Sequence, residues 1–476
     1  MKKFWPITIF IILLATFSLE VLASSFKTII VKNGTDVYKI FTRPNRRYVV
    51  REDLDLGGKE IVIGENSILV FEGGSLLNGK IKGRNTIIEA APIQIFSCIK
   101  ISGNFQCNTV YPQWFGAIPN GKNDCSAAIQ EAIDFAVNEY DVSNPWDIQQ
   151  IQGNGLKVVL PPGVYILEKP IYLRSYTHIE GQGRGVTKLV NGGIQDGMAM
   201  VYMGYYEGEE RIKIHNSSIR NFSINGANYN CIGIYSLSQY SFVENVFITN
   251  CGDYGIYSNE SWCTYITKCH FIYNAIDSDG YSLYLTGRQN GWGANAVTIS
   301  DCEFIGIEDK YANKDEKRIF KGNTICSKNG NGIRIRNCNF QQIDTCITLD
   351  SSGAGISIEN CYFEAVNTPI TGVLYGNHIK NNFFTAPIYS NAIIKSNHMQ
   401  GCSVMNNIVA AGLKDMVIVD EISKDKSLLF YGNTIMGNFR SATILGFKGR
   451  VLDYLKKSKY NQVLTNAGYV YVPKQQ

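Results

Sequence analysis

A seven-residue phrase recurs eight times in the second half of the chain, and it constrains the fold more than any other feature. In every copy the second and seventh places are apolar, the fourth is usually Asn or Asp, and the fifth is mostly small or apolar. The copies are SIRNFSI from Ser218, FVENVFI from Phe242, YITKCHF from Tyr265, TISDCEF from Thr298, RIRNCNF from Arg334, SIENCYF from Ser357, HIKNNFF from His378 and SVMNNIV from Ser403. This alternation predicts two short strands that meet at a tight polar bend. Asn suits the bend because it tolerates left-handed backbone angles and can hydrogen-bond its neighbour in the next coil.

The spacing of the phrase predicts how the strands are arranged. Five of the seven steps between copies are 21 to 25 residues long, which fits one coil of three short strands. A fixed period with nearest-neighbour stacking indicates an all-β solenoid with three sheets, a parallel β-helix. Leucine-rich repeats have a similar period, but the Leu and Asn positions that they require are absent. A sandwich or propeller would need hairpin turns at alternating spacing.

Two steps are longer than the rest, at 33 residues from Ile266 to Ile299 and 36 residues from Ile299 to Ile335. A stacked strand cannot absorb extra residues without losing register, so they must leave the coil as loops. The two insertions belong to neighbouring coils, and we expect their loops to meet. Insertions on one side of a solenoid commonly build a binding site.

The N-terminal part is organised differently. Residues 1–23 have the charged start, apolar centre and small residues of a signal peptide, which predicts export to the periplasm or medium. Residues 24–110 form a β-rich module, residues 111–410 the β-helix, and residues 411–476 a C-terminal coil or cap. One amphipathic helix follows Asp124 or Ser126 as N-cap, with Ile129, Ala132 and Ile133 on its apolar face. We expect this helix to cap the open end of the β-helix.

The segment around this helix resembles a known family. Its matching residues are Trp114, Phe115, Gly116, Ala117, Gly121, Asp124, Ala128, Ile129, Gln130, Ala132, Val158, Leu160, Pro161, Gly163 and Tyr165. On these residues the chain resembles the pectate-lyase-like superfamily, in particular the rhamnogalacturonase/epimerase type, over roughly residues 111–410. The resemblance implies a right-handed parallel β-helix with an N-terminal capping helix. It does not imply one reaction, because such domains occur in lyases, hydrolases, epimerases and phage tail spikes.

A row of aromatic residues is the first candidate for ligand binding. If Ile234, Ile256 and Leu283 point inward, Tyr235, Tyr257 and Tyr284 project outward on one row. Such a strip suits the apolar faces of sugar rings, and Trp292 and Lys310 in the long loops could add contacts. A stacking ladder that only stabilises the sheet is an equal alternative.

Acidic residues precede this row in the two long insertions. Asp277 and Asp279, with Glu308 in reserve, are candidates for the two carboxyl groups that glycoside hydrolysis requires. A lyase would instead need a base and a cation, for which Tyr284, Arg288 or Lys310 could serve. Solvated loop acids are the plainer interpretation of each single residue. Acidic loops could hold Ca²⁺, although no calcium-loop motif is present.

Several features limit the alternatives. The 45 basic and 41 acidic residues leave a net charge of +4, which gives no nucleic-acid footprint. Most of the 13 Cys are interpreted as buried thiols, with Cys98 and Cys107 open as a pair, and no Cys/His spacing suggests zinc. The histidines in or near the repeats, His215, His270 and His378, are interpreted as structural.

The family's own motifs decide how far function can be carried over. The Asn-Thr-Asp, Gly-His-Gly and Arg-Ile-Lys motifs of polygalacturonase-type members have no counterpart here, so their catalytic residues are not transferred. The resulting hypothesis is an exported carbohydrate-active protein that binds and cleaves a polysaccharide, as a hydrolase or a lyase. Its rival is a non-catalytic glycan-binding or surface β-helix.

Overall fold

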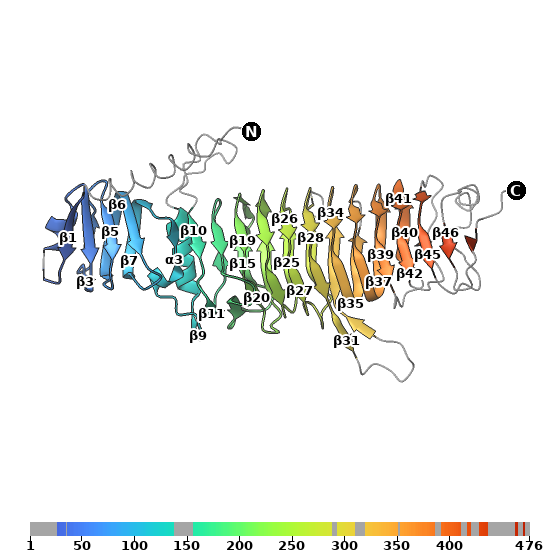
Figure 1. The fold of residues 1–476 in the computed structure, drawn as a ribbon, viewed down its shortest axis with the longest axis horizontal. Helices are drawn as coiled ribbons and strands as arrows, with labels where there is room; N and C mark the ends of the chain where they lie inside the picture. The colour runs from blue at the N-terminus through green and yellow to red at the C-terminus, as the bar shows by residue number, and fades with distance from the viewer. Residues whose placement is uncertain are drawn as a thin grey trace, which may run out of the picture. The chain divides into compact units, whose positions relative to one another are not determined.

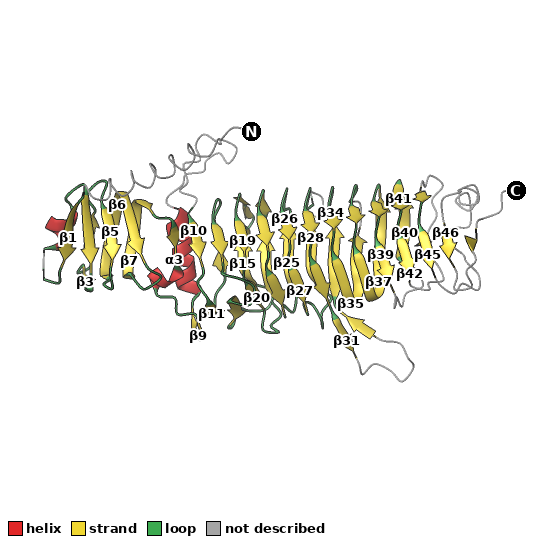
Figure 2. Cartoon of the chain, viewed as in Figure 1, coloured by secondary structure: helices red, strands yellow, loops and turns green. Residues whose placement is uncertain are grey.

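The computed structural model describes residues 26–34, 36–137, 156–287, 293–309, 319–350, 353–385, 392–410, 417–419, 428–436, 462–464 and 470–471. The predicted signal peptide therefore lies outside the described residues. The chain divides into two compact units, residues 1–117 with 134–158 and residues 118–133 with 159–476. Strands form nearly all the regular structure of both units (Figure 2).

The first unit is built from short parallel strands. Its elements are β1 (Lys27–Val31), α2 (Val37–Phe41), β2 (Arg46–Val50), β3 (Leu54–Asp55), β4 (Glu60–Val62), β5 (Ile68–Phe71), β6 (Leu76–Ala90), β7 (Phe96–Gln106), β8 (Thr109–Val110), the 3-10 helix Pro112–Phe115 and most of β10 (Lys157–Val159). Strand β2 pairs in parallel with β1 and β5, and β6 pairs in parallel with β5 and β7. The strand-like pattern of residues 26–110 corresponds to these elements.

The predicted amphipathic helix is α3, Ser126–Val137. Asp124 Oδ1 accepts hydrogen bonds from the backbone N–H and the hydroxyl of Ser126, at 2.9 and 2.5 Å. These bonds hold the chain at the start of the first turn, as expected of a capping residue. Ile129, Ala132 and Ile133 are fully buried, so the apolar stripe is the packed face of the helix. The one-turn helix α2 was not predicted.

The second unit is a right-handed parallel β-helix made of three sheets, as predicted (Figure 1). The first sheet contains β13 (His178–Glu180), β19 (Ser218–Arg220), β23 (Phe242–Glu244), β26 (Tyr265–Thr267), β29 (Thr298–Ser300), β34 (Arg334–Arg336), β36 (Ser357–Glu359), β38 (His378–Lys380), β41 (Cys402–Met405) and β44 (Leu428–Tyr431).

The second sheet carries the ends of the repeated phrases. It contains β9 (Asn120–Asp124), β11 (Gly163–Leu167), β14 (Thr187–Asn191), β20 (Ser223–Asn225), β24 (Phe247–Thr249), β27 (His270–Ile272), β30 (Glu303–Ile305), the first parts of β35 (Asn339–Asp350) and β37 (Tyr362–Tyr375), β39 (Phe383–Thr385), β42 (Ile408–Ala410) and β45 (Thr434–Met436). Strand β46 (Gln462–Leu464) continues it and pairs antiparallel with β47 (Val470–Tyr471).

The third sheet lies between the end of one coil and the start of the next. It contains β12 (Ile171–Tyr172), β15 (Ala199–Met203), β21 (Ile232–Ser236), β25 (Tyr254–Asn259), β28 (Tyr281–Thr286), β33 (Asn323–Lys328), the second parts of β35 and β37, β40 (Ile394–Gln400) and β43 (Val417–Val419). A short pair, β18 (Ile214–His215) with β22 (Ser238–Gln239), links the third sheet to the first.

The bend between the first and second sheets explains the fourth place of the phrase. All eight residues there have left-handed backbone angles, with φ between 53° and 62°. They are Asn221, Asn245, Lys268, Asp301, Asn337, Asn360, Asn381 and Asn406. Asn side chains also bond between coils, as Asn245 Nδ2 does to Asn221 Oδ1 at 2.8 Å. The predicted reasons for Asn at this place are therefore confirmed.

A column of aromatic rings fills the core beneath the second sheet. The seventh places of five successive phrases, Phe271, Phe304, Phe340, Phe363 and Phe384, are fully buried. Neighbouring ring centroids are 4.6 to 5.1 Å apart, and the planes differ by at most 12°. Parallel strands in register bring identical side chains one coil apart, which lets the rings stack.

The cysteines of the fifth place lie inside the bend as buried free thiols. They are Cys269, Cys302, Cys338 and Cys361. Each sulfur has backbone carbonyl oxygens as hydrogen-bond acceptors, for example the carbonyl of Arg336 at 3.3 Å from Cys338 Sγ. Cys98 and Cys107 are also free thiols, and burial raises the pKa of Cys107 to about 12.

Two hairpins leave the coils. The first, β16 (Tyr205–Glu207) with β17 (Glu210–Ile212), is held by the buried carboxylate of Glu260, which binds Arg211 at 2.7 Å and the Tyr206 hydroxyl at 2.9 Å. The second, β31 (Ile307–Asp309) with β32 (Ile319–Lys321), projects from the stack (Figure 1). Its Lys321 pairs with Asp277 of the preceding insertion at 3.0 Å, so the two long insertions meet as predicted.

Candidate functional site

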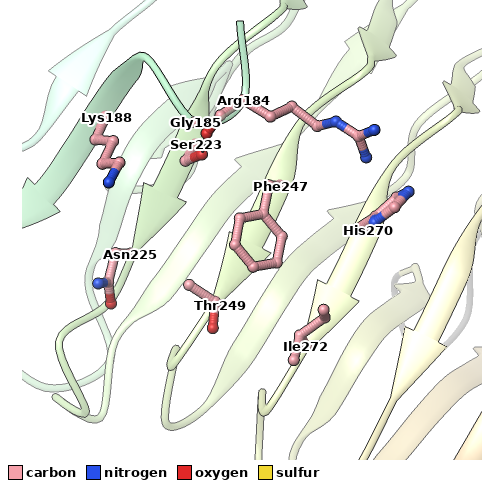
Figure 3. Close-up of a pocket in the computed structure, with 9 residues that line it drawn as sticks. All are labelled: Arg184, Gly185, Lys188, Ser223, Asn225, Phe247, Thr249, His270 and Ile272. Atoms are coloured by element: carbon pink, nitrogen blue, oxygen red, sulfur yellow. Dashed lines mark hydrogen bonds between the residues drawn. The ribbon is translucent and has the colours of Figure 1, made fainter. Parts of the chain in front are cut away.

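The outer face of the second sheet is hollowed into a groove of about 380 Å³. Its nine lining residues are Arg184, Gly185, Lys188, Ser223, Asn225, Phe247, Thr249, His270 and Ile272, and we call it the second-sheet groove. Figure 3 shows Lys188 at one end, His270 at the other and the ring of Phe247 between them. The Arg184 side chain extends across the groove toward His270.

The repeat explains why these side chains share one face. Phe247 is in register with Ser223 on one side and with His270 on the other, and His270 is in register with Glu303. The buried neighbours of this row, such as Ile248, point into the core, so the row itself points outward. The groove therefore has a floor of side chains drawn from successive coils.

The wall of the groove comes from a loop before β14. Ser223 donates its hydroxyl hydrogen to the carbonyl oxygen of Arg184, which anchors the loop above the sheet. Neither Arg184 nor Lys188 makes an ion pair with a carboxylate among the residues that the structure describes. Two cations are thus available in one hollow for an anionic ligand.

His270 and the carboxylate of Glu303 lie at the far end of the groove. His270 Nδ1 lies 3.1 Å from Glu303 Oε2, and about a third of each side chain is exposed. A carboxylate can only accept hydrogen bonds, so Nδ1 carries the hydrogen. Burial lowers the pKa of His270, Arg184 lowers it further, and Glu303 opposes both. The imidazole is therefore neutral at pH 7 and has its lone pair on Nε2.

The structure places His270, which the sequence analysis interprets as structural, in the lining of the second-sheet groove. In the sequence it occupies the sixth place of one phrase, where other copies have Ser, Phe, Glu, Asn, Tyr or Ile. Register with Phe247 and Glu303 could have been read from the aligned phrases. The overhang of Arg184 could not, because it depends on how the loop before β14 folds over the sheet.

The predicted tyrosine row exists on the third sheet. Tyr235 pairs in register with Tyr257, and Tyr257 with Tyr284, while Ile234 and Leu283 are buried. The row is longer than predicted, since Tyr172 and Tyr202 precede it; Cys326 continues it after Tyr284.

The ring geometry of this row favours the stacking-ladder alternative. The centroids of Tyr235 and Tyr257 are 5.5 Å apart with planes 8° apart, and Tyr257 and Tyr284 are 5.2 Å apart. The rings cover one another's faces, so the row is half-buried rather than exposed. Burial raises the pKa of Tyr235 and of Tyr284 to about 12, so both stay phenols. A ligand on this row would therefore contact the hydroxyl groups and edges of the rings.

The predicted acids do not share one surface feature. Asp277 is exposed, pairs with Lys321 and lines a smaller hollow of about 220 Å³ at the corner between the second and third sheets. Asp279 lies nearer the tyrosines, where its charge helps to raise the pKa of Tyr254 after the larger effects of burial and Asp253. Glu308 belongs to the projecting hairpin, opposite Phe320. Their catalytic role remains a prediction.

Three predicted residues, Arg288, Trp292 and Lys310, lie outside the described residues. In the described part of the chain, no group of three or more His, Cys, Asp or Glu residues is arranged to hold a metal ion. Over the same residues, no helix is both long and apolar enough to cross a membrane.

Comparison with known families gives a match to part of the chain. Residues 113–224 match the family described as rhamnogalacturonase A/epimerase, pectate lyase-like. The protein is a right-handed parallel β-helix, and its residues 113–224 are similar to this family. Arg184, Lys188 and Ser223 of the second-sheet groove fall within the matched segment, whereas Phe247 and His270 follow it. A search of curated proteins finds no match to the chain.

Comparison with solved structures finds similar proteins at low sequence identity. An exopolygalacturonase from Thermotoga maritima has a TM-score of 0.51 and 14% identity, over 77% of this chain and 94% of that one. The A-module of a mannuronan C-5 epimerase from Azotobacter vinelandii has a TM-score of 0.44 and 13% identity, over 71% and 100%. ORF18 of Geobacillus virus E2 has a TM-score of 0.48 and 16% identity over 70% of this chain, which spans 62% of that protein. At these identities the likeness concerns the fold alone.

Proposed function

We propose that this chain is exported, binds a polysaccharide that contains uronic acid in the second-sheet groove, and cleaves it by β-elimination. One observation carries the proposal: a hollow holds Arg184 and Lys188, which make no ion pair with the residues that the structure describes, together with His270, whose Nδ1 lies 3.1 Å from Glu303 Oε2. The aromatic floor of Phe247 suits the apolar face of a sugar ring.

The proposed chemistry gives separate roles to Arg184, His270 and Glu303. Arg184 binds the uronate carboxylate and, by neutralising it, makes the C5 hydrogen more acidic. His270 Nε2 removes that proton, the C5–H electron pair forms the C4–C5 double bond, and the bond from C4 to the glycosidic oxygen breaks. The leaving oxygen takes a proton from water, and the imidazolium returns its proton to solvent. Glu303 holds the ring orientation.

An assay on purified mature protein tests the proposal. We expect polygalacturonate or alginate to give new reducing ends together with ultraviolet absorbance from the conjugated double bond, and xylan without uronate groups to give neither. Reducing ends without that absorbance would indicate hydrolysis and favour Asp277, Asp279 and Glu308 instead. Binding without any cleavage would support the rival glycan-binding function.

The pH dependence of kcat/KM gives a second test. Because the base must be neutral and the pKa of His270 is lowered from 6.5, we expect the rate to fall only below pH 6.5. Glu303→Gln removes the carboxylate that raises this pKa, so the acidic limb should move to still lower pH. An acidic limb that is unchanged in Glu303→Gln would show that another group titrates.

A further inference from the structure

A second cluster of aromatic side chains lies on the first sheet, away from the second-sheet groove. Tyr240, Phe242, Trp262 and Tyr265 are each 36 to 39% exposed, and we call them the aromatic patch. They come from two neighbouring coils and form two pairs. Phe242 and Tyr265 stack with centroids 5.0 Å apart and planes 12° apart, and Tyr240 and Trp262 are 5.9 Å apart.

The fold does not require aromatic side chains at these places. Phe242 and Tyr265 belong to one in-register row of the first sheet. The other described members of that row next to them are polar: Ser218 before Phe242, and Thr298 and Arg334 after Tyr265. Other coils of the same sheet therefore have polar residues at this place. Exposed apolar surface that folding does not need is typical of a binding site.

The surroundings of the aromatic patch are polar but carry little net charge. Trp262 is in register with Gln239 in the preceding coil and with Asn295 in the following one, and Asn331 continues this row. Residues in register on parallel strands project to the same side, so the partly exposed amide of Asn295 lies beside the indole, whereas Gln239 is buried. At the other edge the carboxylate of Glu244 pairs with Lys268 at 3.1 Å and with Arg220 at 3.6 Å.

We propose that the aromatic patch is a second, non-catalytic binding surface for a neutral glycan chain. The exposed parts of aromatic side chains make apolar contacts with sugars, and amides exchange hydrogen bonds with hydroxyl groups. The cations at its edge are already paired, so it offers less than the groove to a carboxylate. A stable protein interface buries about 800 Å² per partner, more than four side chains bounded by polar neighbours can supply.

The second-sheet groove and the aromatic patch differ in charge, so we expect them to bind different sugars. The second-sheet groove selects anionic sugars, whereas the aromatic patch holds neutral ones on a different sheet of the same coils. A protein with both surfaces can remain attached to a mixed polysaccharide matrix while the groove acts on its acidic component.

Affinity electrophoresis through gels with xyloglucan, galactomannan or dextran tests this inference. We expect at least one of these neutral polymers to retard the mature protein, and the double variant Trp262→Ala with Tyr265→Ala to lose at least 10-fold in affinity. The control, Tyr229→Ala with Tyr273→Ala, removes two exposed tyrosines outside the patch and should bind like the wild type. Cleavage of short uronate oligosaccharides should be the same in all three proteins.

Two further measurements separate loss of glycan binding from misfolding and from dimer formation. Trp262→Phe keeps a ring at this site and should fold, so it should retain binding but lose any tryptophan fluorescence change caused by the glycan. Sedimentation velocity tests whether a second copy covers the patch. The inference fails if no neutral polymer retards the protein, if both double variants bind equally, or if the wild type is a dimer that the patch variant dissociates. None of these results depends on whether the groove cleaves its substrate.

Discussion

His270→Ala should lower kcat for β-elimination by about 10²- to 10⁴-fold, the range typical of removing a general base. In the proposed mechanism Nε2 of His270 takes the substrate proton, and Glu303, 3.1 Å from Nδ1, holds the ring in place. Polysaccharide binding should persist, because Arg184, Lys188 and Phe247 are unchanged. Steady-state kinetics and binding isotherms on the same preparation separate the two effects.

Two control variants define what would contradict this expectation. His378→Ala removes a repeat histidine of the first sheet that bonds Ser403 at 2.7 Å, and it should leave the rate unchanged. Asp277→Asn changes the exposed acid that pairs with Lys321, and it too should leave the rate unchanged. If His270→Ala kept full activity while Asp277→Asn lost it, the reaction would belong to the acids of the insertions.

Phe340→Ala should destabilise the β-helix by about 3 to 5 kcal/mol, the usual cost of truncating a buried aromatic residue. Phe340 is the middle ring of the core column and stacks on Phe304 at 5.1 Å and on Phe363 at 4.8 Å. Its removal leaves a cavity that both neighbours face, and rings held in register by their strands cannot close it.

Urea unfolding followed by circular dichroism measures this loss. The matched control is Asn339→Ala, one residue earlier on the same strand but exposed, which should change stability by less than about 0.5 kcal/mol. Repeat arrays can unfold in steps, so the midpoint of each transition should be compared between variants. Equal midpoints for Phe340→Ala and the wild type would show that the column contributes little.

The coil architecture was predictable because the repeat couples only neighbouring residues. The apolar second and seventh places, the Asn bend and the 21- to 25-residue period each describe contacts within one coil or with the next. The in-register tyrosines followed from the same rule. Their stacking geometry did not, because ring orientation depends on packing between coils rather than on the period.

The candidate site was less predictable. The sequence drew attention to long insertions, whereas the groove lies on a regular face of the second sheet that contains no insertion. A single histidine in a repeat, such as His270, does not by itself indicate a function, so the sequence predicts a structural role for it. The proposed role of His270 rests on two neighbours. Glu303 lies one coil away, and Arg184 is 86 residues earlier in the chain.

By itself the sequence determined the solenoid, its bends, the apolar places of its core and the amphipathic helix, since all of these depend on periodic burial of apolar side chains. Only the tertiary structure decided which outward side chains meet. Side chains that point outward need not pack in the core, so their sequence is not periodic and does not indicate where a site lies. Register between coils and the fold of one loop brought Arg184, Phe247 and His270 into one groove, and Trp262 and Tyr265 into another surface.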